Sequence, residues 1–345
     1  MYDVAVIGSG PCGVSAALKL EELGVNFILI DKQSFPRNKP CGGVLPFRAV
    51  EEFELNPEAF ERPLLGYRIF SRGGVEVETS FPGEGALVDR AKFDYYLISR
   101  LNKEPVRLRV RGVKAVKEGV EVLCEKKVKA SLVIACDGAN SIVRKSLGMN
   151  YPELATALQY SFRLNNREIE RRIGNWFEVY YYFSRGYGWI TPLKGIIKVG
   201  IGGLGKEYNR ELLDSFIVSP IVKDKLEGAE LSGYEAHRIP MHGPMKTTVK
   251  NRVLLAGDAG GFVYPGTGEG IYYAMKSGII AAEVSEISLK SNRFDDSFIE
   301  AGYTEKLEAS GLLSLRDIDF IDTVLKSPQA AERYVKKLAK LNSIY

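Results

Sequence analysis

The sequence feature that most constrains the fold is a glycine-rich turn near the N-terminus, placed between two apolar segments. Residues 2–7 (YDVAVI) form an almost uninterrupted apolar run, which is typical of a buried parallel strand. The turn Gly8-Ser9-Gly10-Pro11-Cys12-Gly13 follows, and Pro11 is well placed to begin a helix. A second apolar run ends at Asp31, 18 residues after Gly13. This order of strand, turn, helix, strand and acid predicts a dinucleotide-binding fold.

The composition of this turn has a physical reason. Glycines let the backbone approach a pyrophosphate closely, and the N-terminus of the following helix presents N–H donors to it. An acid at the end of the second strand is placed to bind a ribose hydroxyl. The residues expected to contact the adenosine diphosphate half of the ligand are Gly8, Gly10, Cys12, Gly13, Asp31 and the adjoining Lys32.

A second glycine motif lies roughly 250 residues further along the chain. A buried strand predicted at residues 252–256 ends in Gly257-Asp258. The run Pro265-Gly266-Thr267-Gly268-Glu269-Gly270 then precedes a helix predicted from residue 268 to about 289. The N-terminus of such a helix stabilises an anion. The two motifs, in this order, predict one dinucleotide that is held at both ends.

Composition narrows the class of protein. The chain has 345 residues, enough for two domains, and its 45% hydrophobic and 26% charged content is that of a soluble globular protein. A net charge of +4 gives no reason to expect a nucleic-acid partner. Four cysteines without paired spacing and two histidines predict no metal site. No apolar run reaches the ~18 residues of a membrane span, so we expect a cytoplasmic protein.

The C-terminal end leaves two interpretations open. Lys336, Lys337 and Lys340 lie close to Leu338 and Leu341, which makes a small basic amphipathic helix. We favour a solvated helix face over the alternative, contact with a membrane surface.

The order of the predicted elements indicates an α/β protein with two interleaved domains. We predict a Rossmann-like dinucleotide-binding domain from residues 1–60, 85–150 and 250–290. Residues 61–84 and 151–249 are expected to form an antiparallel β-sheet substrate domain, and residues 291–345 a short helical C-terminal segment. One strand of the sheet, Tyr180-Tyr181-Tyr182-Phe183, is entirely aromatic. It belongs either to the wall of an apolar ligand cavity or to an ordinary sheet core.

Further segments carry a resemblance to a known family. They are Lys39-Pro40-Cys41-Gly42-Gly43, Asp137-Gly138, Tyr187-Gly188-Trp189-Ile190-Thr191-Pro192, and the stretch from Gly257 to Ile271. With the N-terminal turn, they resemble the p-hydroxybenzoate hydroxylase superfamily of flavoproteins and, within it, the geranylgeranyl reductase family. The family pattern for the third segment is Tyr-x-Trp-x-Phe-Pro, so Thr191 stands in place of a phenylalanine. The resemblance covers roughly residues 1–290.

The resemblance implies FAD as the cofactor and assigns roles to individual residues. Arg90, the backbone at Val113, Asp137 and Asp258 would contact FAD, and Gly268, Gly270 and Ile271 would offer N–H groups to its pyrimidine end. Cys41, Gly42 and Val44 would line the reactive side of the flavin, and Tyr187 and Trp189 the substrate cavity. The candidate catalytic residues are therefore Cys41, Tyr187 and Trp189.

The activity that the resemblance implies is reduction of isolated C=C bonds in a geranylgeranyl or other prenyl chain of an isoprenoid or lipid. The flavin would deliver a hydride, and Cys41, Tyr187 and bound water remain alternatives for the proton donor. Cys41 also has a structural alternative, as a small residue that shapes its loop. No second dinucleotide unit is evident, so the electron donor would be external: NAD(P)H, ferredoxin or another reductase.

Two other functions remain open on the same fold. One is a flavin monooxygenase that hydroxylates its substrate, and the other is a flavin-binding carrier without turnover. A flavin halogenase is disfavoured, because Tyr187 stands where the first residue of its paired-tryptophan motif would be.

Overall fold

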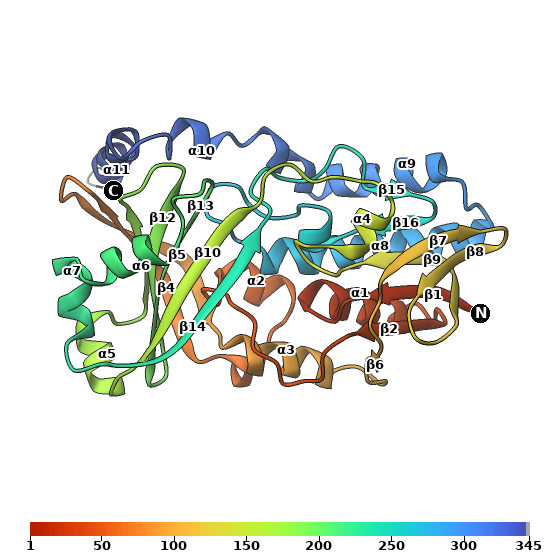
Figure 1. Cartoon of the computed structure of the whole chain (residues 1–345), viewed down its shortest axis with the longest axis horizontal. Helices are drawn as coiled ribbons and strands as arrows, with labels where there is room; N and C mark the ends of the chain where they lie inside the picture. The colour runs from red at the N-terminus through yellow and green to blue at the C-terminus, as the bar shows by residue number, and fades with distance from the viewer. Residues whose placement is uncertain (343–345) are drawn as a thin grey trace. The chain divides into compact units, whose positions relative to one another are not determined.

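The computed structural model describes residues 1–342 and contains two compact units, each assembled from segments distant in sequence (Figure 1). Unit 1 comprises residues 1–37, 94–154 and 239–318, and unit 2 comprises residues 38–93, 155–238 and the segment from Asp319 onwards. Residues 343–345, which the predicted C-terminal segment included, lie outside the described residues.

The bounds of the two units differ from the domain bounds expected from the sequence. Residues 38–60, expected in the dinucleotide-binding domain, belong to unit 2. The C-terminal helices are divided at residue 318 between the two units and do not form a segment of their own. The first difference has a local cause, because hydrogen bonds tie the loop around Cys41 to unit 2 at Val88 and Gln159.

Unit 1 is built on a mainly parallel sheet with the strand order β15-β16-β9-β1-β2-β6, and the β7–β8 hairpin joins it through β8 and β9. Neighbouring pairs from β16 to β6 are parallel, as the dinucleotide-binding pattern predicts. Val4, Ala5 and Val6 have no exposed surface, so the apolar run of β1 is buried on both faces. Its strands are β1 (Tyr2–Ile7), β2 (Phe27–Asp31), β6 (Val106–Arg107), β7 (Gly112–Val116), β8 (Gly119–Leu123), β9 (Val128–Ala135), β15 (Val249–Lys250) and β16 (Val253–Leu255).

The helices of unit 1 follow the sequence signals at their ends. Helix α1 begins at Pro11, as predicted, and α8 begins at Ile271, three residues later than predicted. The later start has a backbone cause, because Gly268 adopts a φ of +68°, which no α-helix contains. The elements are α1 (Pro11–Glu22), α4 (Ile142–Ser146), η3 (Gly257–Ala259), α8 (Ile271–Ser291), α9 (Asp296–Ala309) and η4 (Leu312–Asp317), and α3 (Arg90–Ser99) runs from residues of unit 2 into unit 1.

Unit 2 is built on a sheet with the strand order β14-β10-β13-β12-β11-β4-β5-β3. We expected an antiparallel sheet, but β4 and β11 are parallel. These strands come from distant segments, so no tight turn imposes an antiparallel pairing. The edge strand β14 was not predicted, because its residues are mostly exposed and give no apolar pattern. The strands are β3 (Val44–Leu45), β4 (Arg62–Ser71), β5 (Glu76–Leu87), β10 (Ala155–Arg163), β11 (Trp176–Tyr181), β12 (Gly186–Leu193), β13 (Ile196–Gly203) and β14 (Glu230–Ile239).

The aromatic run on β11 is divided between the two faces of the unit 2 sheet, because side chains alternate along a strand. Tyr180 is fully buried in the core beneath α5 and α6, and its ring stacks on Phe70 at 4.7 Å. Tyr181 points to the opposite face, with its ring 6.3 Å from that of Tyr187. The expected sheet core therefore holds for Tyr180, and the expected cavity wall at Tyr181 stays a prediction. The helices of unit 2 are α2 (Phe47–Glu52), η1 (Pro57–Ala59), α5 (Asn166–Arg172), α6 (Arg210–Ile217), α7 (Pro220–Lys223), η2 (Asp224–Leu226), α10 (Phe320–Thr323) and α11 (Pro328–Asn342).

The C-terminal helix α11 is amphipathic, as the sequence indicates. Ala331 and Val335 are buried, whereas Lys336 and Lys337 are exposed, and Lys336 pairs with Glu332 at 2.7 Å. The side chain of Leu341 lies outside the described residues. Across residues 1–342, no helix combines the length and the apolar character needed to cross a bilayer.

Candidate functional site

The N-terminal turn of unit 1 has a shape that only glycine allows at two of its positions. Gly8 has a φ of +98°, and a Cβ on Gly13 would lie 1.7 Å from the Gly8 carbonyl oxygen. Asp31 is joined to this turn, because its Oδ2 accepts hydrogen bonds from Ser9 N–H at 2.8 Å and from the Ser9 hydroxyl at 2.9 Å. The acid at the end of β2 therefore lies directly beside the turn, as the sequence predicted.

The structure also brings the second glycine motif against the first. Gly257 has a φ of +56°, and a Cβ there would lie 3.0 Å from the Cys12 Cβ. A Cβ on Gly278 of α8 would lie 2.3 Å from the Cys12 carbonyl oxygen, so α1 and α8 pack with almost no space between them. The Gly257 N–H donates to Ser277 Oγ at 2.9 Å, which attaches the Gly257 turn to α8. Two motifs that are distant in sequence therefore form one surface.

This surface fits an anionic dinucleotide. Neither the N-terminus of α1 at Gly10 nor that of α8 at Gly270 has a side-chain cap, and helix N-termini of this kind favour an anion. The space beside Gly10 is open except for Arg37, whose Nη2 would lie 3.3 Å from a Cβ added there. Arg37 pairs with the buried Asp94 at 3.3 Å and carries a positive charge to the turn. Sequence reasoning missed Arg37, because an isolated arginine in a loop gives no pattern.

Two further polar side chains of unit 1 make contacts in this region. Asp137 follows the end of β9, and Arg144 belongs to α4. Asp137 Oδ2 accepts the N–H groups of Ile142 at 2.7 Å and Val143 at 3.1 Å. Its Oδ1 is buried with no hydrogen-bond partner within residues 1–342, and burial raises the pKa of this carboxyl. Arg144 donates to the carbonyls of Ala139 at 2.7 Å and Ala259 at 2.8 Å, and so connects the segment after β9 to the second glycine motif.

Fewer contacts are known for the remaining residues that we expected to contact the cofactor. Asp258 Oδ1 would lie 3.5 Å from a Cβ on Gly270, beside the start of α8. Val113 is in the apolar core of unit 1, and its N–H donates to Ser146 Oγ at 3.1 Å, so this part of the expected backbone contact is engaged within the protein. Lys32 is exposed, and Arg90 is buried at the start of α3. In the described part of the chain, no group of three His, Cys, Asp or Glu side chains could hold a metal ion.

In unit 2, the loop around Cys41 lies against one face of the sheet. Val88 N–H donates to the Gly43 carbonyl at 2.8 Å, and Gln159 Nε2 to the Cys41 carbonyl at 3.4 Å. The Gly43 N–H donates to Cys41 Sγ at 3.3 Å. A Cβ on Gly42 would lie 3.8 Å from Thr191 Oγ1, so the loop and β12 are in contact. Val44 follows as the first residue of β3.

Tyr187 and Trp189 lie on this same face of the sheet. The Trp189 indole covers two glycines of β13, since a Cβ would lie 2.2 Å from its Cζ2 at Gly200 and 3.1 Å from its Cζ3 at Gly202. The ring of Tyr187 is 6.0 Å from that of Trp189. Burial raises the pKa of the Tyr187 phenol well above its ordinary value, and the neighbouring Cys41 adds to the shift. The structure therefore brings the three candidate catalytic residues of unit 2 together.

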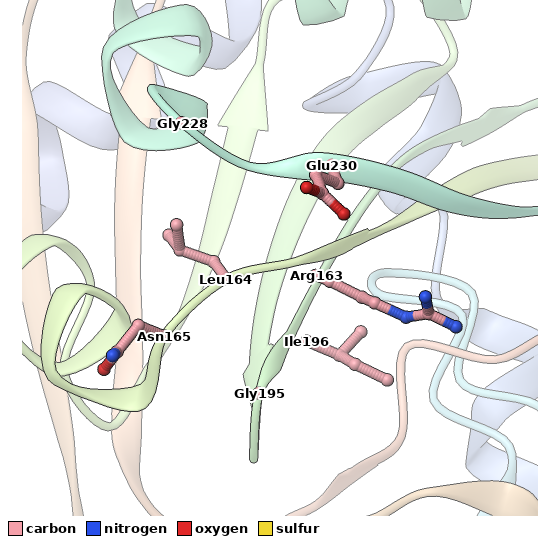
Figure 2. Close-up of a pocket in the computed structure, with 7 residues that line it drawn as sticks. All are labelled: Arg163, Leu164, Asn165, Gly195, Ile196, Gly228 and Glu230. Carbon is pink, nitrogen blue, oxygen red and sulfur yellow. The ribbon is translucent and has the colours of Figure 1, made fainter.

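A separate pocket of about 440 Å³ lies at the turn between β12 and β13 (Figure 2). Figure 2 shows Arg163 and Ile196 pointing to one side of it and Asn165 to the other. Its lining contains none of the predicted site residues, and its residue nearest to Tyr187 in sequence is Gly195, beyond the end of β12. It is therefore distinct from the aromatic face beside Cys41. The lining residues are Arg163, Leu164, Asn165, Gly195, Ile196, Gly228 and Glu230.

Known proteins share both the sequence pattern and the fold. The family described as the FAD binding domain matches residues 1–55 and 103–282. The digeranylgeranylglycerophospholipid reductase of Methanococcus vannielii is 30% identical over 92% of this chain and 85% of its own length. The chloroplastic geranylgeranyl diphosphate reductase of Nicotiana tabacum is 30% identical over 97% of this chain and 77% of its own length.

A solved structure, the geranylgeranyl bacteriochlorophyll reductase-like protein of Thermoplasma acidophilum, has the same fold. The two superpose with a TM-score of 0.83 at 22% identity, over 98% of this chain and 91% of the other. The match to the FAD-binding family, the two relatives and the joined glycine motifs agree: the chain belongs to the geranylgeranyl reductase family of FAD-dependent flavoproteins.

Proposed function

We propose that this protein is an FAD-dependent reductase that saturates isolated C=C bonds in a geranylgeranyl or related prenyl chain. The observation that carries the proposal is that two relatives named for different molecules, a glycerophospholipid and a diphosphate, are both geranylgeranyl reductases by name. They share the prenyl chain and differ in its polar end. The prenyl chain is therefore the part of the substrate that we assign, and its polar end is left to experiment.

The aromatic face of unit 2 supports this assignment. An isolated alkene has no carbonyl that an oxyanion hole could polarise, so binding and shape must position it. Tyr187, Trp189 and Tyr181 present rings to one face beside the Cys41–Gly42 loop, and such a surface suits an apolar chain. Cys41, Tyr187 and Trp189 remain the proposed catalytic residues.

The residues of unit 1 would hold the cofactor at several points. The turn from Gly8 to Gly13 would hold the pyrophosphate, Asp31 the ribose, and the N-terminus of α8 the anionic end of the reduced flavin. Asp31 Oδ1 accepts one hydrogen bond, from the Gln33 N–H at 2.9 Å, and retains a second lone pair for a ribose hydroxyl. When bound and reduced, FAD supplies the hydride. An external donor would reduce it, and contact with a membrane through the exposed lysines of α11 stays a prediction.

Arg37 is expected to strengthen FAD binding through the pyrophosphate. We expect Arg37→Met to weaken FAD binding by at least ~10-fold, because a charge-assisted hydrogen bond contributes about 1.5–3 kcal/mol. FAD fluorescence titration of the FAD-free protein measures the dissociation constant. Arg107→Met, which removes an exposed arginine from β6 of the same unit, should leave it unchanged.

A second variant separates binding from stability in this experiment. Arg37→Met also leaves Asp94 buried without its ion-pair partner, so the double variant Arg37→Met/Asp94→Asn removes that penalty. The double variant should recover stability and still bind FAD weakly. Recovery of full FAD affinity in the double variant would show that Arg37 acts only through Asp94.

The proposed reaction is tested by anaerobic turnover. FAD in the protein is reduced with dithionite, excess reductant is removed, and digeranylgeranylglycerophospholipid is added without oxygen. We expect the flavin absorbance to return and the lipid mass to rise by two hydrogen atoms for each bond reduced. Geranylgeranyl diphosphate, tested in parallel, reports which polar end is accepted.

Other outcomes of the same assay identify the alternatives. Reoxidation that requires oxygen, with a product that gains an oxygen atom, identifies a monooxygenase. A flavin spectrum that no prenyl compound changes, with or without oxygen, identifies a carrier. Either result overturns the proposed reduction.

A further inference from the structure

Three polar atoms are buried without hydrogen-bond partners on the face of unit 2 that carries Trp189, and the ammonium of Lys198 lies on the same face. Within the described residues, Gln159 Oε1, Thr191 Oγ1 and Trp189 Nε1 have no partner. Lys198 is 6% exposed, and its Nζ stands 3.9 Å from Asp89 Oδ2 and 4.0 Å from Glu235 Oε2, too far for a direct hydrogen bond. Burying such groups unsatisfied is costly, so a bound molecule is expected to complete their hydrogen bonds.

The strand register places these groups in one patch. Thr191 on β12 lies opposite Lys198 on β13. Trp189 lies opposite Gly200, which in turn lies opposite Gln159 on β10. Side chains of directly opposed residues on one face are about 5 Å apart at Cβ, which long polar groups can span. We call Gln159, Thr191 and Lys198 the polar patch.

The polar patch lies directly beneath the Cys41 loop. A Cβ on Gly42 would lie 3.8 Å from Thr191 Oγ1, and Gln159 Nε2 donates to the Cys41 carbonyl at 3.4 Å. Gln159 Nε2 also donates to Glu235 Oε2 at 2.5 Å. The polar patch is therefore in contact with the loop that carries one of the candidate catalytic residues.

The charges of the patch select its ligand. Two carboxylates, Asp89 and Glu235, face the single ammonium of Lys198, so a phosphate or another anion would be repelled. Water fits, because the patch presents both donors and acceptors, and a buried water makes about three hydrogen bonds. The gaps of 3.9 and 4.0 Å around Lys198 Nζ leave its N–H groups without a direct hydrogen bond to either carboxylate, and a water beside them can accept one.

We propose that Lys198, Gln159 and Thr191 hold a buried water that delivers the proton for reduction of the prenyl double bond. The inference rests on the proposed function. In the reaction the π bond breaks and two C–H bonds form, one from the flavin hydride and one from this proton. The water takes a replacement proton from the Lys198 ammonium, and the resulting amine is protonated again from solvent through Glu235, whose side chain is 21% exposed.

Two observations favour this route over direct transfer from Tyr187. The raised pKa of Tyr187 makes its phenol a reluctant acid. Thr191 also replaces the phenylalanine of the family pattern, and a phenylalanine ring there would fill the space and remove the hydroxyl. The water site is therefore expected to be a property of this chain and of relatives with a small polar residue at this position.

A crystal structure of the FAD-free protein tests the water site without reference to activity. We expect ordered water within hydrogen-bond distance of Lys198 Nζ and Thr191 Oγ1 in the wild type, and its loss in Thr191→Val, which keeps the shape without the hydroxyl. A dry patch in the wild-type structure would overturn the proposal. Failure of the wild type to reduce any prenyl compound would instead overturn the proposed function and leave this observation standing.

Single-turnover kinetics test the role of the water. Loss of a positioned proton donor typically slows a reaction by 10²–10⁴-fold, so we expect Lys198→Met and Thr191→Val to slow anaerobic flavin reoxidation by ~100-fold. FAD affinity and dithionite reduction should change little, and Thr191→Ser should recover much of the rate. Lys194→Met, on the exposed turn of the same hairpin, is the control.

A solvent isotope experiment separates this role from a structural one. The wild-type reoxidation rate should fall in D₂O, and the deuterium effect should persist or increase in Lys198→Met, because the slowed proton transfer then limits the reaction. Unchanged rates in Lys198→Met and Thr191→Val, together with loss of turnover in Tyr187→Phe, would assign the proton to Tyr187 and overturn the proposal.

Discussion

Replacing Gly278 with alanine is expected to weaken FAD binding by roughly 5- to 150-fold. A Cβ on this residue of α8 would lie 2.3 Å from the carbonyl oxygen of Cys12, where carbon and oxygen normally stay about 3.3 Å apart. The atom it meets is backbone, so the two helices must separate by about 1 Å. Overpacking of this kind costs about 1–3 kcal/mol, which corresponds to the stated loss if the cofactor restores the native spacing.

The reason for expecting a binding defect is the position of the contact. Cys12 belongs to the first turn of α1, and α8 carries the second glycine motif at its N-terminus. The close approach at Gly278 therefore sets the spacing between two helix N-termini that are open to the ligand. A change in that spacing moves backbone donors relative to each other, and no side-chain rotation can compensate for it.

Gly302→Ala in α9 is the matched control. It is also a helical glycine of unit 1, but a Cβ there would meet only Val284 Cγ1, at 3.9 Å. We expect this variant to bind FAD normally and to be more stable by up to about 1 kcal/mol, since alanine favours a helix over glycine. FAD titration and urea unfolding of both variants make the comparison. Normal FAD affinity in Gly278→Ala would show that α1 and α8 do not need this close approach.

Features of unit 1 that depend on local sequence could be predicted in detail. The strand β1, the Pro11 start of α1 and the acid at the end of β2 each have a signal within a few residues of their position. The start of α8 was placed three residues too early, because an apolar helical pattern does not reveal that Gly268 has a positive φ. Glycines fix such boundaries through backbone geometry, which composition alone does not specify.

Features of unit 2 that depend on strand pairing could not be predicted from the sequence. The parallel pairing of β4 with β11 and the presence of β14 follow from contacts between distant segments. The polar patch also depends on the pairing of strands. Thr191 and Lys198 are opposite each other only because β12 and β13 pair in one register. A shift of one residue would place Lys198 on the other face, in the apolar core.

Two arginines of unit 1 could not be identified from the sequence as residues of the candidate site either. Arg37 lies in a loop without periodicity, and Arg144 acts through two backbone carbonyls, those of Ala139 and Ala259. Sequence motifs identify the surface that a ligand contacts. They do not identify the residues that hold the separate segments of that surface together, because those residues need only reach a carbonyl or a neighbouring charge.

The second large effect is expected at Glu178, which lies on the face of the unit 2 sheet opposite the candidate site. Its carboxylate is fully buried and is contacted by Lys225 Nζ at 2.7 Å, Arg68 Nη1 at 3.2 Å and the Tyr180 hydroxyl at 2.7 Å. Burial, and then the Glu178 charge, raises the pKa of the Tyr180 phenol well above its ordinary value, so this hydroxyl remains a donor.

Glu178→Ala is expected to lower the free energy of unfolding by about 3–5 kcal/mol, because it removes the carboxylate partner of the largely buried Lys225 and leaves Arg68 with only the exposed Glu76 and Glu78. Urea unfolding measures the change.

Glu76→Gln is the control for this prediction. Glu76 also pairs with Arg68, but its side chain is 53% exposed, and such pairs contribute at most about 1 kcal/mol. The double variant Glu178→Ala/Lys225→Met should recover part of the loss, because it removes the cation whose carboxylate partner is gone. A loss in Glu178→Ala no larger than that in Glu76→Gln would mean that water solvates Arg68 and Lys225 once the carboxylate is gone, and that this side of the sheet is more open than its packing indicates.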